Sequence, residues 1–238
     1  MEFLTFQLYG AMASWGDTAV GEYRPSSSQP SKSAVMGLLA AALGVLRNEE
    51  EKLRQLTNSL GFAVRVDAPG ELIRDYHTVQ VPSAKKNVHY STRQDELSAS
   101  KLNTILSQRD YRVDAASMVA IWQKQGANWT LSELTEALRK PKLTLYLGRK
   151  ACPLSLPLNP KIIEIDNLRG AFDAACQDEK HLLGLPNQPT TTWYWEEIGD
   201  AGMQADSTYQ RHDRLLSRKR WQYANRQEFA RLEQREEG

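Results

Sequence analysis

The order of extended and helical segments constrains the fold of this chain more than any other feature. Without its loops, the chain runs strand, helix, strand twice, and a polar insertion separates the two halves. In order, the segments are a strand at 3–9, a helix from Ala34, a strand at 62–66, a strand at 111–122, a helix at 130–138 and a strand at 142–147. This order is typical of the ferredoxin-like split βαβ domain, whose sheet is also used by RNA-recognition modules. We therefore predict an α+β fold.

Local capping signals support the helices. Ser31 or Ser33 can cap the first helix, and Thr130 with Glu133 has the spacing of a capping box. Residues 49–60 have a second helical pattern, with leucines on one face. Further extended patterns cover residues 72–81, 162–165 and 192–198, and the basic segment near the C-terminus is expected to mix strand and helix.

Residues 82–110 differ from the segments around them. They are rich in Ser, Thr, Lys, Asn and Gln and show no core-forming period. Such a stretch inside a compact domain is usually a protruding or disordered insertion, and we expect one here.

Composition excludes several classes of protein. The longest apolar run, residues 34–46, is too short to span a bilayer, and the N-terminus lacks the pattern of a secretory signal. Two cysteines without a CxxC pair argue against a zinc site or a disulfide scaffold. The chain has no phosphate-binding glycine loop, no GxSxG and no HExxH motif. We expect a cytoplasmic protein with no cofactor, no metal and no membrane association.

The charge balance hides local segregation. The net charge is only +1, from 30 basic and 29 acidic residues. Residues 139–150, however, contain five basic and no acidic residues, and residues 211–231 contain seven basic residues against Asp213 and Glu228. A polyanion responds to such local runs, so both are candidate nucleic-acid contacts.

Three further clusters combine aromatic and ionisable side chains. Residues 146–154 place a glycine and two cations after a predicted strand, a plausible contact for a phosphate backbone. Residues 15–33 gather Trp15, Tyr23 and two cations, Arg24 and Lys32, before a helix N-terminus, whose free N–H groups favour anions. Residues 74–77, Arg-Asp-Tyr-His, could orient a general base or stack on an RNA base.

These motifs together carry a family resemblance. They are Met12-Ala13-Ser14-Trp15-Gly16, Tyr23-Arg24-Pro25, Pro30-Ser31-Lys32-Ser33 with Met36-Gly37-Leu38-Leu39, residues 73–79 and residues 146–154. In this order and spacing they resemble the CasD-type subunits of type I-E CRISPR Cascade, which are members of the RAMP superfamily of CRISPR RNA-binding proteins. The resemblance runs from residue 3 to about residue 158 and weakens beyond it.

The resemblance implies a ferredoxin-like (RRM-like, RAMP) domain over residues 1–158, with a protruding thumb at about 78–112. A smaller strand-rich and basic part follows at 159–238. The implied function is capping of the 5′ handle of the CRISPR RNA (crRNA) in an antiviral surveillance complex. Its implied partners are the crRNA handle, the Cascade backbone and large subunits and, through the complex, target DNA. The chain lacks the glycine-rich loop that RAMP proteins commonly carry near the C-terminus, so no RNA contact is assigned there by analogy.

We predict RNA contacts through stacking, base-edge hydrogen bonds and phosphate pairing. The candidate residues are Trp15, Tyr23, Arg24, Lys32, Ser33, Arg74, Tyr76, His77, Tyr146, Gly148, Arg149 and Lys150. Of the four aromatic platforms among them, at least one is expected to lie in the core.

Two alternatives remain open. In type I-C systems a relative of this subunit cuts repeat RNA without metal; here Tyr76, His77 and one of Lys85 or Lys86 would have to supply the catalytic groups. A protein-interaction scaffold that touches no RNA is the third hypothesis, and the clustered basic residues argue against it.

Overall fold

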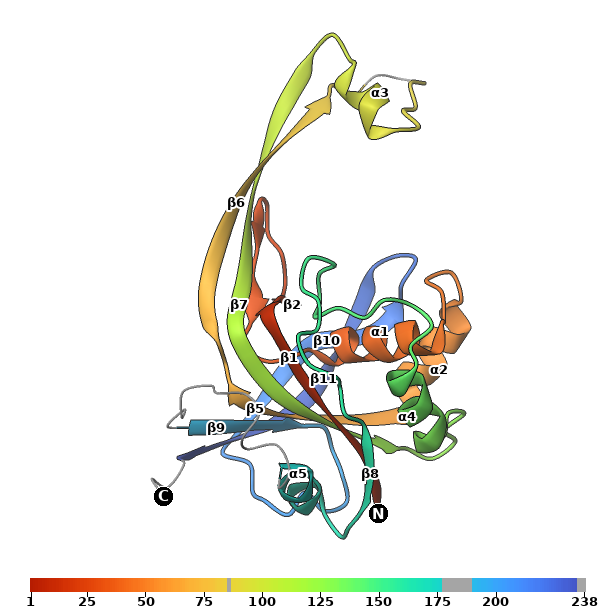
Figure 1. Ribbon diagram of the computed structural model, residues 1–238, viewed down its shortest axis with the longest axis vertical. Coiled ribbons are helices and arrows are strands. Elements are labelled where there is room, and N and C mark those ends of the chain that lie inside the picture. The colour runs from red at the N-terminus through yellow and green to blue at the C-terminus, as the bar shows by residue number, and fades with distance from the viewer. Residues whose placement is uncertain (85–86, 177–189, 235–238) are drawn as a thin grey trace.

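The structure, a computed structural model, describes residues 1–84, 87–176 and 190–234. It is a mixed α/β protein built mostly on antiparallel strands (Figure 1). The strands are β1 (Glu2–Ala13), β2 (Trp15–Gly16), β3 (Tyr23–Arg24), β4 (Ser26–Ser27), β5 (Leu60–Ala68), β6 (Glu71–Pro82), β7 (Leu102–Gln123), β8 (Lys161–Glu164), β9 (Thr190–Trp195), β10 (Ser207–Ser217) and β11 (Gln222–Gln234). The helices are α1 (Lys32–Leu43), α2 (Glu50–Ser59), α3 (Arg93–Leu97), α4 (Leu131–Arg139) and α5 (Leu168–Cys176).

One large sheet organises the chain. Its strand order is β10-β11-β9-β5-β7-β1-β8, and β3 and β6 pair with β7 beside this path. Within it, β5, β7, β1 and β8 are neighbours and all pair in antiparallel register. Along the chain, α1 and α2 connect β1 to β5, and α4 lies in the connection from β7 to β8. The strands after residue 189 add to the same sheet, because β9 pairs with β5.

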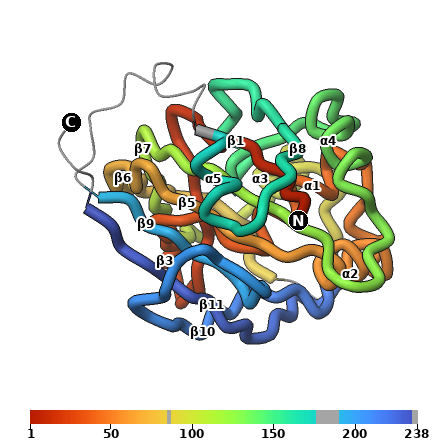
Figure 2. The backbone as a smooth tube through the Cα atoms, turned by 90° about the horizontal axis from the view of Figure 1, so that it is seen from below, coloured from red at the N-terminus to blue at the C-terminus, as the bar shows by residue number. Residues whose placement is uncertain are grey.

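Helices cover both faces of this sheet. Leu4 packs in the core that α1, α2 and α4 share, whereas the adjacent Phe3 packs against α5 on the other face. Neighbouring residues of a strand point to opposite faces, so this alternation in β1 divides the core into two layers. Figures 1 and 2 show α5 on the face opposite α1, with β10 and β11 along one side of the molecule.

A long two-stranded arm leaves the sheet. It is formed by β6 and the first half of β7, which pair without interruption from Glu71 opposite Val113 to Pro82 opposite Leu102. Figure 1 shows the arm projecting well beyond the rest of the molecule, with α3 at its tip. The expected insertion does protrude, but residues 102–110 form regular strand. The sequence hides this strand because many side chains on both faces of the ribbon are exposed, which removes the hydrophobic period.

The capping predictions are confirmed. Ser31 caps α1 by accepting a hydrogen bond from the Ala34 N–H, and Thr130 and Glu133 form the expected capping box of α4. The extended patterns at 3–9, 62–66 and 72–81 are also strands. The pattern at 162–165 is a strand only as far as Glu164, and the pattern at 192–198 only as far as Trp195.

Two local predictions are wrong. Residues 142–147 form no strand; only an isolated bridge joins Tyr146 to Pro153. Their alternation arises because Leu145 and Leu147 bury their side chains in the α1 core while the backbone remains irregular. The described part of the basic segment after residue 206 contains no helix: it is the β10–β11 hairpin.

Candidate nucleic-acid interface

An open groove of about 1670 Å³ lies beside α1. It is bordered by the loop after β1, the exposed side of α1, residues 143–150 and the β10–β11 hairpin. It brings together six of the predicted residues, which are Arg24, Ser33, Tyr146, Gly148, Arg149 and Lys150. The irregular backbone of residues 143–150 therefore lines the groove where a strand was expected.

Charge is distributed unevenly along the groove. Its basic lining residues are Arg24, Arg47, Arg149, Lys150, Arg211 and Arg218. The acidic lining residues are Asp17 and Asp213, and Asp213 is paired with the guanidinium of Arg226. The groove therefore presents net positive charge to a ligand, although the whole chain is nearly neutral.

A buried carboxylate anchors the root of the arm beside this groove. Asp110, which is 1% exposed, accepts hydrogen bonds from Arg74 Nε (2.8 Å) and from the Tyr23 hydroxyl (2.5 Å). The Arg74 guanidinium also lies 4.8 Å from the centre of the Tyr23 ring. Hydrogen bonds from Arg74 and Tyr23, with the nearby charge of Arg149, outweigh burial and hold the pKa of Asp110 below its usual value. Tyr23 and Arg74 therefore bind each other and Asp110.

Arg149 joins this anchor to the groove. Its guanidinium donates to the carbonyl oxygens of Asp110 (3.3 Å) and Arg24 (3.2 Å) and lies 4.7 Å from the centre of the Tyr111 ring. Arg149 therefore holds the groove wall in place and also contributes positive charge to it. The neighbouring Lys150 is exposed and is the freer cation of the pair.

Gly148 was expected to let backbone approach a ligand, but it approaches another segment of the chain. Its φ is +84°, and a Cβ atom there would lie 1.9 Å from the carbonyl oxygen of Ser14. The same two segments are joined by a hydrogen bond, in which the Ser14 N–H donates to the Leu147 carbonyl at 3.0 Å. Glycine is required because residues 147–148 pack against the backbone after β1.

Trp15 and Lys32 are corrections to the predicted site. Trp15 is 3% exposed and lies in the α1 core, so its ring has no free face for a base. Lys32 is 2% exposed; its ammonium donates to Glu196 (2.8 Å) and to the Leu60 carbonyl (2.9 Å). Burial lowers the pKa of Lys32 to about 8, against the opposing pull of Glu196. Its charge is committed to the interior and is not available to a phosphate.

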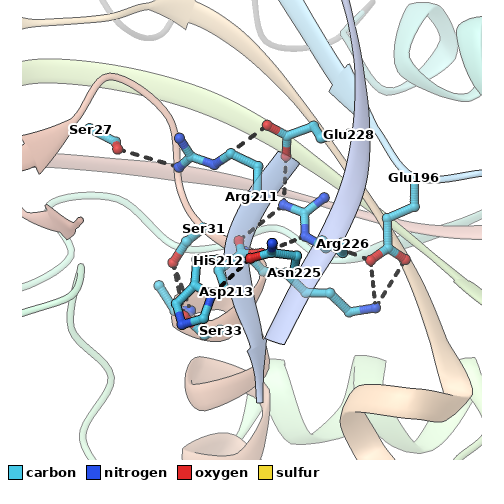
Figure 3. A network of polar contacts seen from close by, with 12 residues as sticks. Ser27, Ser31, Ser33, Glu196, Arg211, His212, Asp213, Asn225, Arg226 and Glu228 are labelled. Atoms are coloured by element: carbon cyan, nitrogen blue, oxygen red, sulfur yellow. Dashed lines mark hydrogen bonds and ion pairs between the residues drawn. The ribbon is translucent and has the colours of Figure 1, made fainter. Parts of the chain in front are cut away.

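Lys32 belongs to a buried ionic network that joins α1 to β10 and β11 (Figure 3). Arg226 is its centre: the guanidinium donates to Asp213 (2.6 and 3.0 Å) and to Glu228 (2.5 Å) and lies 3.8 Å from Glu196. The Asp213 carboxylate also accepts from the backbone N–H of Lys32 at 2.8 Å. The network thus fixes the C-terminal hairpin against the first turn of α1, at the edge of the groove.

Charge pairing opposes burial in this network, with different results. Burial alone would lower the pKa of Arg226, but Asp213 and Glu228 raise it above its usual range. Burial would raise the pKa of Glu196, but Lys32 and Lys124 bring it below its usual value. For Glu228 burial prevails over Arg226, and its pKa is raised.

Tyr76 and His77 lie on β6, out on the arm, and do not join the groove residues. Tyr76 is 57% exposed, and His77 Nε2 lies 2.5 Å from Asp75 Oδ2. Because they are consecutive residues of one strand, their side chains point to opposite faces. Lys85 and Lys86 lie outside the described residues.

The β10–β11 hairpin was predicted only as a basic segment that mixes strand and helix. The structure separates its members: Arg211 and Arg218 line the groove, whereas Arg226 is buried. The groove residues His212 and Tyr223 and the anchor Asp110 were not singled out. No local sequence pattern marks Asp110 as a site residue, because its partners come from three distant segments.

Residues 1–84, 87–176 and 190–234 contain no group of three or more His, Cys, Asp or Glu side chains placed to hold a metal ion. None of their helices has the length and apolar character needed to cross a bilayer.

Comparison with known proteins agrees with the mixed α/β fold. Residues 3–228 match the family described as CRISPR-associated protein (Cas_Cas5). Over 157 residues the chain is 38% identical to "CRISPR system Cascade subunit CasD" of Escherichia coli (strain K12), a match that covers 66% of this chain and 69% of that protein.

Solved structures show the same similarity. A chain of "CRISPR RNA-guided surveillance complex" has a TM-score of 0.67 at 26% identity, covering 98% of this chain and 90% of its own length. "Crystal structure of Cas protein" has a TM-score of 0.62 at 26% identity, covering 98% and 94%. These matches place the molecule among CRISPR-associated proteins. Within that class, the chain belongs to the Cas5 family, and the resemblance inferred from its sequence motifs is confirmed.

Proposed function

We propose that this chain is a non-catalytic, cytoplasmic RNA-binding subunit of a Cascade-type surveillance complex, in which it holds the single-stranded 5′ handle of the crRNA. The groove beside α1 is the proposed binding site. The relative from E. coli is a Cascade subunit, and a chain of an RNA-guided surveillance complex has a similar fold over 98% of this chain.

The observation that carries the proposal is the net positive charge of the groove. Arg24, Lys150, Arg211 and Arg218 come from three separate parts of the chain yet line one groove. Cations that converge from distant segments suit a flexible phosphate backbone, which single-stranded RNA supplies. Ser33 and Tyr146 in the same lining offer hydroxyl groups for base edges.

The sheet topology supports a finer assignment of the fold. The order β5-β7-β1-β8, with its helices, supports the ferredoxin-like assignment, because all neighbours are antiparallel and β1 and β5 flank β7.

We assign the β6–β7 arm as the thumb that contacts a backbone subunit, and the body as the contact for the large subunit. Target DNA is then met only through the complex. The division into residues 1–158 and 159–238 stays a prediction.

Neutralising two groove cations should weaken handle binding and its salt dependence. In Arg24→Gln/Lys150→Gln, each lost phosphate contact should reduce the slope of log K against log [salt] by roughly 0.7, so the slope should fall by about 1.4. Fluorescence anisotropy with handle RNA at several salt concentrations measures this. Lys140→Gln is the control, because this exposed lysine at the end of α4 does not line the groove. An unchanged slope in the folded double variant would remove the groove from the interface and favour the protein-scaffold hypothesis.

The competing function is metal-independent cleavage of repeat RNA. It needs several groups around one phosphate, and Tyr76 and His77 point to opposite faces of β6. Asp75, whose carboxylate lies 2.5 Å from His77 Nε2, can orient that ring, but Tyr76 lies on the other face of the ribbon. The geometry therefore favours the binding role.

Incubating the purified protein with cognate repeat RNA in EDTA should leave the RNA intact. His77→Ala should behave identically in this assay, because no turnover is expected from either protein. Denaturing gel electrophoresis over several hours measures cleavage. Site-specific products from the wild type that disappear in His77→Ala, while handle binding persists, would establish the nuclease instead.

A further inference from the structure

Trp221 is the most unusual residue of the β10–β11 hairpin. It is 60% exposed, and its φ is +53°. The other non-glycine residues with positive φ in the described chain are Asn87, Asp114 and Asn159, types that tolerate this conformation. The left-handed backbone conformation of a tryptophan costs free energy, and so does exposure of its apolar ring to solvent. A contact outside this chain is the natural reason for both.

The hairpin fixes the position of this ring. Arg218 donates to the Tyr223 hydroxyl at 2.7 Å, and its guanidinium lies 4.2 Å from the centre of the Trp221 ring. The turn is closed by Arg220 N–H, which donates to the Ser217 hydroxyl at 3.1 Å. Arg47, from the loop after α1, lies 5.9 Å from the ring centre, too far for direct stacking.

The surroundings of the ring carry a small excess of positive charge. The pocket around Trp221 is lined by Arg47, Lys52, Arg218 and Lys219 and by the carboxylates of residues 49–51. Glu49 pairs with Lys52 and Glu51 with Arg54, whereas Glu50 accepts from two neutral donors, the Ser217 hydroxyl and the Lys219 N–H. An incoming anion therefore meets more cations than carboxylates around an aromatic surface, with Arg47 and Arg218 beside the ring.

This site is continuous with the groove, since Arg47, Arg218 and Trp221 also line the groove's wall. We propose that Trp221 is a stacking platform for one nucleobase of the single strand that leaves the groove, with Arg47 and Arg218 on the flanking phosphates. An aromatic ring among cations suits single-stranded nucleic acid, because any base offers a flat face for stacking and every linkage a charge. The inference rests on the proposed RNA-binding function and extends its footprint to the hairpin tip.

Trp221→Ala should weaken binding of handle-containing RNA by about 5- to 150-fold, the range for loss of one stacked base. Trp221→Phe should retain most of the affinity. The salt slope should stay unchanged, because stacking releases no counterions. Leu216→Ala is the matched control: this residue is 53% exposed on the same hairpin and does not line the groove. Trp221→Gly guards against misfolding, because glycine adopts the left-handed conformation without strain and should lose affinity while keeping the thermal midpoint.

An abasic scan of the RNA identifies the stacked base. At one position, removing the base and removing the Trp221 ring should be strongly non-additive, because both delete the same contact. Additive effects at every position, or wild-type affinity in Trp221→Ala, would overturn the proposal and assign the ring to a protein partner. These outcomes are distinct from a failure of the proposed function, in which the wild type itself shows no salt-dependent RNA binding.

Discussion

Replacing Arg226 by methionine should destabilise the protein by about 3–5 kcal/mol, because it leaves carboxylates buried without their cation. Asp213, Glu228 and Glu196 all lie within 4 Å of this guanidinium, and each is less than a tenth exposed. For a chain of this size, the thermal midpoint should fall by roughly 6–20 °C. Differential scanning calorimetry or urea unfolding measures the change.

Arg231→Met provides the matched control. Arg231 lies on the same strand and pairs with Glu233 at 2.9 Å, but its side chain is one-third exposed. Exposed ion pairs contribute about 0–1 kcal/mol, so this variant should remain close to the wild type. Equal losses in the two variants would show that Arg226 is solvated and that the network does not hold the hairpin.

The network also determines how the basic C-terminal run is understood. From the sequence, residues 211–231 were candidates for phosphate contacts on charge alone. Whether an arginine is buried depends on partners that only the fold supplies: Asp213 is 13 residues from Arg226, and Lys32 is 164 residues from Glu196. The charge run alone does not separate Arg211 and Arg218, which line the groove, from Arg226, which is buried.

Local signals were the reliable part of the sequence analysis. The caps at Ser31 and Thr130 depend on residues three positions apart and appear as predicted. The strands of the sheet core were recognised from their apolar patterns. In the arm, β6 was recognised from its extended pattern, but residues 102–110 of β7 were missed, because their side chains are largely exposed and show no hydrophobic period. Residues 142–147 were misassigned, because alternating leucines fill the core without any strand partner.

The candidate site residues also show that contacts between distant segments are hard to predict from the sequence. Tyr23, Arg74 and Arg149 were chosen as RNA contacts from their chemistry, yet all three bind around Asp110. The cations and aromatic rings that suit RNA also suit a buried carboxylate. Only the position of that carboxylate distinguishes the two uses, and the sequence does not encode it locally.

Gly148→Ala should be the most disruptive single substitution at the groove. An alanine Cβ would lie 1.9 Å from the Ser14 carbonyl oxygen, and that oxygen belongs to backbone that cannot rotate away. The new residue would also have to adopt a φ of +84°. Left-handed strain and overpacking together should cost about 3 kcal/mol or more. The protein can avoid the overlap only by moving residues 147–150 outward, which breaks the hydrogen bond between Ser14 and Leu147.

The comparison with Gly126→Ala separates these two causes. Gly126 has a φ of +78° but no atom within 4 Å of the added Cβ, so its variant reports left-handed strain alone, about 1 kcal/mol. The free energy of unfolding, measured with urea, should be clearly lower for Gly148→Ala than for Gly126→Ala. Handle affinity should fall only in Gly148→Ala, because displacement of residues 147–150 moves Arg149 and Lys150 from the groove wall. If the two alanine variants are equally stable and bind RNA equally well, residues 147–148 do not pack against Ser14, and the groove is not built on this contact.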